Sequence, residues 1–368
     1  MFDWVPRWLR VLFGALVLAL VVWLLVVPQF GQAEEALDAI AGVNVGFVVL
    51  AGVLVAGSVV AQASLTRVVL PAVQRPTLAG MVRIELASTA VSHTVPGGTA
   101  AGTALAYRLL TRAGVTGPAA GFALGVRGIG SAVVLNAILW AALVVSVPTR
   151  GFDARYAIAA LVGAALLGLT GVLLIGLLRA RDTTTRLVTR LVRPIPFVDH
   201  EGAPAVVKRL GDQLHDLVSD RRLAVQATTR AAVYWLSLAA ALWILLYAFG
   251  WTGDPISVVV AFGIVNVLAA IPITPRGLGV LEAVLIPMLV GFGAPGYAAT
   301  LGVIGWRLLS FWAPIPLGTI SYVSIRIAEP DVPTTNRDAV ARELAEAGAT
   351  GRQTLGDWAR RRGLRRPR

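Results

Sequence analysis

The sequence predicts an all-α, polytopic integral membrane protein with about nine membrane segments, arranged as two inverted repeats that contain short broken or re-entrant helices. Hydrophobic residues make up 57% of the 368 positions and charged residues only 14%, which is more apolar surface than a soluble core could bury. Several apolar runs reach the roughly 20 residues that a helix needs to cross about 30 Å of hydrocarbon. In addition, two Gly-rich segments that open with a proline stand at matching places in the two halves.

These matching segments share one register. Three pairs keep a nearly constant separation: 179 residues for Pro96 and Pro275, 179 for Gly114 and Gly293, and 180 for Arg127 and Arg307. Broken hydrophobic segments at corresponding places in two halves are the best sequence pointer to a transporter-type binding site. We therefore expect such a site near the middle of the bilayer.

The N-terminal membrane half is predicted to cover residues 1–178. Its first apolar run, 12–27, outlasts the core of a typical signal peptide and is expected to be an anchor. Further runs follow at 43–63 and 78–95. We expect a protein of the cell (inner) membrane. Cytoplasmic loops are enriched in Lys and Arg, so the arginines after the second run predict a cytoplasmic loop there. The acidic stretch at 28–42 is then outside, and the N-terminus is cytoplasmic.

The rest of this half contains the first short segment. Pro96 ends the run before it, and residues 97–110 are expected to cross back as a short or unwound helix. Long apolar runs at 118–147 and 154–178 follow, the first with an expected break near Gly128.

A polar linker and a basic tail frame the second half. Residues 179–228 are predicted to form a cytoplasmic amphipathic linker, because apolar residues recur there at helical spacing between charged ones. The C-terminal membrane half, 229–327, carries runs at 230–249, 256–273, 277–292 and 298–325. The tail, 328–368, ends with six Arg in its last nine residues and is expected to be cytoplasmic.

Loop charge indicates that the repeats are inverted. Counted this way, the segment after Pro96 runs from outside to inside, and the segment after Pro275 runs from inside to outside. If both are re-entrant hairpins instead, we expect the topology to be restored by splitting a long run at Gly128 or Pro314.

Residues 275–283 (PRGLGVLEA) and 306–314 (WRLLSFWAP) resemble the transmembrane region of the lysylphosphatidylglycerol synthase family, a flippase-like domain that also occurs in stand-alone membrane proteins. The resemblance implies movement of lipid across the bilayer. It also implies roles for five residues of the second half: Pro275, Gly277, Gly279, Glu282 and Arg307. In the first half Arg127 alone remains of the charged set that family members carry. The synthase's aminoacyl-transfer domain is not expected, because the tail is shorter than the roughly 50 residues of a small domain.

Glu282 lies inside an apolar segment, where a carboxylate costs about 2.5–3.5 kcal/mol unless it is paired, protonated or hydrated. It could bind a cationic headgroup, exchange a proton, or form a structural pair with Arg276 or Arg307. His93, just before Pro96, could titrate near neutral pH or serve as a structural group.

Arg127 and Arg307 occupy equivalent places and could clamp a lipid phosphate, or extend toward an interface as long basic side chains do. Near the two turns, backbone amides could hold an anion at the start of a half-helix, or the glycines could serve close helix packing. The predicted binding residues are therefore Pro96, Gly97, Gly98, Arg127, Pro275, Gly277, Gly279, Glu282 and Arg307.

Three functions fit these residues. The first is a flippase that binds and translocates an anionic or polyprenyl-linked (glyco)lipid at a midplane site. The second is a non-catalytic accessory subunit that presents lipid to a separate glycosyl- or aminoacyl-transferase. The third is a membrane enzyme, which would need a carboxylate pair such as Glu85 and Glu282 in one cavity. No cofactor, metal or nucleic acid is expected, because the single lysine lies outside any P-loop pattern and cysteine is absent.

Overall fold

The computed structural model describes residues 42–95, 97–150, 219–269 and 279–327, together with the isolated positions 40 and 168. All regular elements in these ranges are helical. The predicted spans 12–27 and 154–178, most of the linker, and the tail lie outside the described residues.

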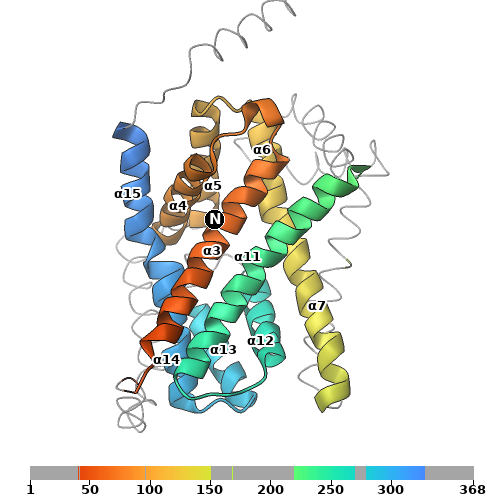
Figure 1. The fold of residues 1–368 in the computed structure, drawn as a ribbon, viewed down its shortest axis with the longest axis vertical. Coiled ribbons are helices and arrows are strands. Elements are labelled where there is room, and N and C mark those ends of the chain that lie inside the picture. Colours follow the sequence, from red (N-terminus) through yellow and green to blue (C-terminus); the bar gives the residue numbers. More distant parts are fainter. Residues whose placement is uncertain are drawn as a thin grey trace, which may run out of the picture.

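Four helical stretches are long and apolar enough to cross a membrane. They are α3 (Val45–Val69), α6 (Gly117–Gly125) continued by η3 (Val126–Gly130) and α7 (Ser131–Arg150), α11 (Arg221–Ala248), and α14 (Gly296–Arg307) continued by η5 (Leu308–Trp312) and α15 (Pro314–Ile327). Helices α3 and α11 cross at the centre of the molecule (Figure 1) and pack closely against each other. The polytopic membrane fold is thus confirmed.

Two pairs of shorter helices form hairpins. Helices α4 (Leu78–Thr94) and α5 (Gly98–Arg112) pack together. Gln74 before α4 accepts a hydrogen bond at 3.1 Å from the amide of Thr116 after α5, so both ends of this hairpin lie at one end of the molecule. Helices α12 (Pro255–Leu268) and α13 (Val280–Gly291) pack likewise. In Figure 1 the first hairpin occupies the upper half and the second the lower half.

Of the two alternatives left open for 97–110 and 277–292, the described helices favour re-entrant hairpins over separate crossings. The four hairpin helices contain 12 to 17 residues and are about 18–25 Å long, which is less than the roughly 30 Å of hydrocarbon. With re-entrant hairpins, no long run has to be split into two crossings, contrary to the expectation. Each hairpin returns to the side of the membrane from which it started, just as two crossings would, so every later loop stays on the same side. The long runs continue as helices through Gly128 and Pro314.

The two halves repeat one order of helices in opposite directions. A crossing helix, a hairpin and a second long helix follow one another in each half (Figure 1), but α3 ascends in this view where α11 descends. The ends of α5 and α13 match in detail. Gly114 and Gly293 have φ values of 89° and 93°, and the next amide in each case reaches back five residues, as in a Schellman cap. The predicted repeat register is confirmed at these glycines.

One end of the molecule carries most of the described arginines. The loop between α3 and α4, the end of α5, the start of α11 and the end of α15 all lie at the top of Figure 1. We call this the basic end; its arginines are Arg67, Arg75, Arg83, Arg108, Arg112, Arg221, Arg222 and Arg326. Arg150, the last residue of α7, lies at the opposite end.

Small residues bring the arms of the first hairpin together. A Cβ placed on Gly98 would overlap the backbone of Ser92 in α4, and one placed on Gly102 would overlap both Ser92 and the carbonyl oxygen of Ser88. Ser88 and Ser92 are themselves buried. Close helix packing, which small residues permit in membranes, therefore accounts for Gly98.

We predict that Gly102→Ala lowers the free energy of unfolding by about 1–3 kcal/mol, the usual range for overpacking. Gly57→Ala in α3 is the matched control, because a Cβ there meets no atom within 4 Å and alanine favours the helix by up to about 1 kcal/mol. Unfolding of the purified protein in detergent micelles measures both. Equal stability of the two variants would contradict the close contact.

Candidate functional site

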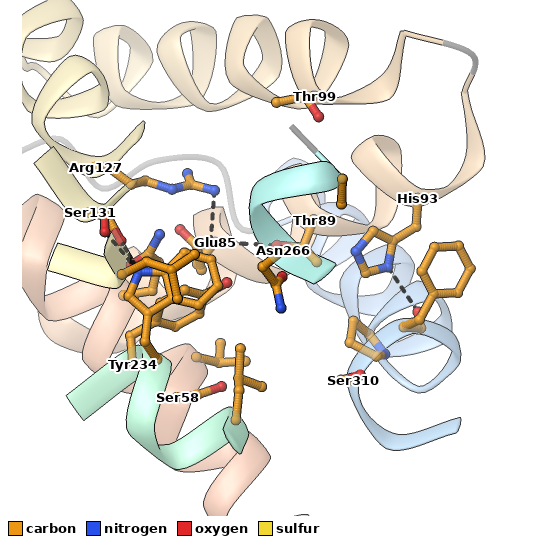
Figure 2. A pocket seen from close by; sticks show the side chains of 18 of the residues that line it. Ser58, Glu85, Thr89, His93, Thr99, Arg127, Ser131, Tyr234, Asn266 and Ser310 are labelled. Carbon is orange, nitrogen blue, oxygen red and sulfur yellow. Dashed lines mark hydrogen bonds and ion pairs between the residues drawn. The ribbon is translucent and has the colours of Figure 1, made fainter. Parts of the chain in front are cut away.

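A cavity of about 360 Å³ lies between the two hairpins (Figure 2). Residues from α3, α11, both hairpins and both long helical runs line it, and its walls carry both apolar and polar side chains. The polar lining includes Ser58, Gln62, Glu85, Thr89, His93, Thr99, Thr103, Arg127, Ser131, Asn266, Arg307 and Ser310. A cavity with both polar and apolar walls is therefore available to a ligand.

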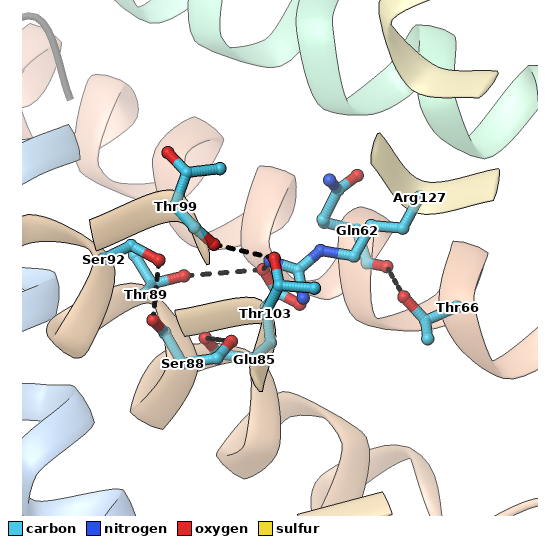
Figure 3. A network of polar contacts seen from close by, with 9 residues as sticks. All are labelled: Gln62, Thr66, Glu85, Ser88, Thr89, Ser92, Thr99, Thr103 and Arg127. Carbon is cyan, nitrogen blue, oxygen red and sulfur yellow. Dashed lines mark hydrogen bonds and ion pairs between the residues drawn. The ribbon is translucent and has the colours of Figure 1, made fainter. Parts of the chain in front are cut away.

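Arg127 and Glu85 form the first ion pair of the site. Arg127 Nη2 lies 2.8 Å from Glu85 Oε1, and the two side chains are 17% and 8% exposed. Figure 3 shows the pair within a network of α4 and α5 hydroxyl groups. Arg127 belongs to the π-helical turn η3, where the amide of Ser131 reaches back to the carbonyl of Val126. Turns of this kind frequently occur at functional sites.

Glu282 and Arg307 form the second ion pair. Arg307 Nε lies 2.5 Å from Glu282 Oε1, and these side chains are 7% and 16% exposed. Glu282 Oε2 also accepts the amide of Gly279 at 2.8 Å, where the chain turns into α13 with a φ of 81°. Glu282 therefore joins the start of α13 to α14. Of the alternatives for this carboxylate, the pair with Arg307 is present; Arg276 lies outside the described residues.

The two pairs are equivalent in their arginines but not in their acids. Each arginine adjoins a π-helical turn, η3 or η5, and in η5 the amide of Ala313 bonds Leu308 O at 2.8 Å. The acid, however, lies on α4 in the first half and on α13 in the second. Arg127 thus has a carboxylate partner from the first helix of the first hairpin, whereas the partner of Arg307 comes from the second helix of the second hairpin.

His93 connects the first hairpin to the second arginine. Its Nδ1 lies 2.8 Å from Phe311 O, and because a carbonyl only accepts, this nitrogen donates. The two rings stack with centroids 4.3 Å apart, while the Arg307 guanidinium lies 4.6 Å from the Phe311 centroid. Contacts therefore run from α4 through Phe311 and Arg307 to α13.

Two buried polar atoms on the cavity wall have no hydrogen-bond partner within the described part of the chain. They are Gln62 Oε1 and Trp306 Nε1, whose residues are 8% and 4% exposed. Buried polar groups are normally satisfied. An acceptor and a donor are thus available to a polar ligand or water. Neither residue was expected from the sequence, where a lone Gln or Trp in an apolar run carries no distinguishing signal.

The predicted binding residues fall into three groups. Arg127 and Arg307 line the cavity, and Glu282 adjoins it through Arg307. Gly279 caps α13, whereas Gly97 and Gly98 lie at the turn of the first hairpin and not on the cavity wall. The remaining predicted residues, Pro96, Pro275 and Gly277, lie outside the described residues.

These features define a polytopic membrane protein in which two inverted repeats form a cavity between their hairpins, with two largely buried ion pairs beside it. Residues 8–318 match the family described as the lysylphosphatidylglycerol synthase TM region, and the chain belongs to this family. A UPF0104 membrane protein of Methanothermobacter thermautotrophicus is 30% identical over 86 residues. That alignment covers 23% of this chain and 26% of the relative, so it spans about a quarter of the relative's length.

We predict that Glu85 and Arg127 are energetically coupled. Arg127→Met should lower the free energy of unfolding by about 3 kcal/mol, because it leaves a buried carboxylate unpaired. Adding Glu85→Gln should restore part of this loss, giving a coupling energy of about 1–3 kcal/mol in a double-mutant cycle measured in detergent.

The control cycle combines Glu85→Gln with Arg326→Met at the exposed end of α15. These effects should add to within about 0.5 kcal/mol. A coupling for Glu85 and Arg127 no larger than in this control would contradict an energetically important pair.

Proposed function

We propose that this protein moves a lipid with a phosphate-bearing headgroup across a cell membrane and binds that headgroup in the cavity between the hairpins. One observation supports this above the others. Two arginines, one from each inverted repeat and each held by a glutamate, line a single buried cavity.

Arginine suits a lipid phosphate because its planar guanidinium can donate two parallel hydrogen bonds to two phosphate oxygens. While no headgroup is bound, Glu85 and Glu282 would hold the arginines in place and limit the energy of a bare charge in the membrane. An arriving phosphate would then share or replace the carboxylate as the partner of each guanidinium. Serine, threonine and asparagine side chains on the wall could receive a sugar or polyol attached to the phosphate.

Movement across the membrane would use the inverted repeat. In transporters of this kind, one repeat rocks against the other around a fixed midplane site. Here the contacts of His93 with Phe311 and of Glu282 with Arg307 link the hairpins to η5 and α14. Such motion would exchange these contacts for others. By the positive-inside rule we propose that the basic end faces the cytoplasm. The prediction that both termini are cytoplasmic concerns segments outside the described residues and stays a prediction.

A transport role fits the carboxylates better than catalysis does. Glycoside hydrolysis, for example, needs two carboxyl groups facing each other across the bond that breaks. Glu85 lines the cavity, whereas Glu282 does not, and each is bonded to its own arginine. We therefore propose that the protein is not an enzyme.

The family description favours a second candidate, because it names the membrane region of a synthase. In this alternative the chain presents lipid to a separate glycosyl- or aminoacyl-transferase bound at the linker and tail. Deleting 328–368 distinguishes the two, since a transporter should still move lipid and an accessory subunit should lose its partner.

We predict that Arg127→Ala and Arg307→Ala each slow lipid movement at least tenfold. A charge-assisted hydrogen bond contributes about 1.5–3 kcal/mol, which corresponds to roughly 10- to 150-fold. The assay follows fluorescent phosphatidylglycerol in proteoliposomes by quenching of the outer leaflet. Glu282→Gln combined with Arg307→Ala should also be inactive.

Arg326→Ala is the control for this assay, because Arg326 lies at the exposed end of α15. Arg127→Lys separates charge from geometry: it keeps the charge but loses the planar fork, so an intermediate rate is expected. Full activity of the double variant, in protein that remains folded by size-exclusion chromatography, would remove both arginine and glutamate from the site.

A further inference from the structure

One side of α5 is polar, although this helix belongs to a hairpin that packs among the long apolar helices. Thr99, Thr103 and Tyr107 follow one another at four-residue spacing, which places them along one side of a helix, and all three are exposed. Thr111 and Arg108 extend this side to the end of the helix. The adjacent side of the helix carries Gly98 and Gly102, which face α4. We call Thr99, Thr103, Tyr107, Arg108 and Thr111 the α5 stripe.

The α5 stripe connects the cavity with the basic end. Thr99 and Thr103 both line the cavity, and Figure 3 shows them with the Glu85 and Arg127 pair. Arg108 and Arg112 are exposed near the C-terminal end of α5, which lies at the basic end. Hydroxyl groups therefore accompany the path from the ion pair to the membrane surface.

The corresponding helix of the second repeat lacks such a stripe. In the 179-residue register, Glu282, Ile286 and Val290 stand where α5 has Thr103, Tyr107 and Thr111, so α13 has no hydroxyl group there. Leu281 is the described α13 residue on the cavity wall. Because the two hairpins share one architecture, this difference comes from the residues and not from the fold.

Threonine is well suited to such a path in lipid. The Thr103 hydroxyl donates to Thr99 O at 2.8 Å, and the Thr111 hydroxyl donates to Tyr107 O at 3.0 Å. This satisfies each hydroxyl hydrogen within the helix, so the side chain is tolerated beside acyl chains. The oxygen lone pairs still accept hydrogen bonds from water or from headgroup hydroxyls.

We propose that the α5 stripe is the route along which a phosphate-bearing lipid headgroup passes between the basic end and the cavity while its acyl chains stay in the bilayer. This inference rests on the proposed function. Arg108 and Arg112 attract the anionic headgroup at the surface, the threonines keep the path hydrated, and Arg127 receives the phosphate at its inner end. In this conformation the headgroup enters from the basic end.

The absence of cysteine from the chain makes the route directly testable. Single cysteines replace Thr99, Thr103 and Tyr107 on the stripe, Ala283 and Val290 on the exposed side of α13, and buried Ala106. The proteins are placed in phosphatidylcholine vesicles and treated with the polar, membrane-impermeant reagent 2-sulfonatoethyl methanethiosulfonate from the basic end. The α5 and α13 positions are similarly exposed in the fold, so the comparison separates water from lipid.

We expect modification at the three stripe positions to be at least tenfold faster than at Ala283, Val290 and Ala106. Adding phosphatidylglycerol to the vesicles should slow modification at Thr103→Cys at least threefold. Equal rates on α5 and α13 would overturn the route. Fast modification that is insensitive to phosphatidylglycerol would reduce the stripe to a water-filled vestibule and would also overturn it.

Transport provides an independent measurement. Thr99→Val together with Thr103→Val removes two hydroxyls at constant shape and should slow movement of fluorescent phosphatidylglycerol at least fivefold. Thr319→Val is the matched control, because Thr319 is exposed on α15 and makes the same bond within its helix. An unaltered rate in the double variant overturns the inference alone, whereas absence of lipid movement in the unmodified protein overturns the proposed function itself.

Discussion

Two arginines buried at the middle of a membrane protein require partners, and this requirement organises the site. A charge at the centre of a bilayer costs about 2.5–3.5 kcal/mol on insertion scales. Arg127 and Arg307 lie on long crossing helices, and their carboxylates come from the hairpins. Each ion pair therefore satisfies a charge and also fixes a hairpin against a crossing helix.

The π-helical turns explain how the arginines reach the cavity. A π-helical turn inserts a residue into a helix and changes which side chains face inward beyond it. Turns η3 and η5 occur at corresponding places in the two repeats, each beside the arginine. In the first repeat Trp235 of α11 supports the turn, because its Nε1 lies 2.9 Å from both Ser131 O and Ser131 Oγ. The local irregularity is thus held by a neighbouring helix and directs a charge into the cavity.

The sequence alone predicts much of this fold and less of the site. Apolar length located α4 to within a residue at either end, and the glycine register identified the matching ends of α5 and α13. The sequence left open whether the short segments cross or re-enter, because hydropathy records apolar character and not whether a segment returns. Glu85 was not assigned to Arg127, because its place on α4 has no equivalent in the second repeat. Gln62 and Trp306 depend on tertiary packing alone.

The differences between the repeats therefore matter as much as their likeness. An inverted duplication by itself offers equivalent surfaces to both sides of the membrane, because each element on one side has a counterpart on the other. Any preference for one side must arise where the counterparts differ in chemistry. Here the acid moves from α4 to α13, and the hydroxyl groups of Thr103, Tyr107 and Thr111 on α5 are matched by Glu282, Ile286 and Val290 on α13. The shared fold positions an arginine from each repeat on the cavity, and these unmatched residues make the chemistry of the two hairpins different.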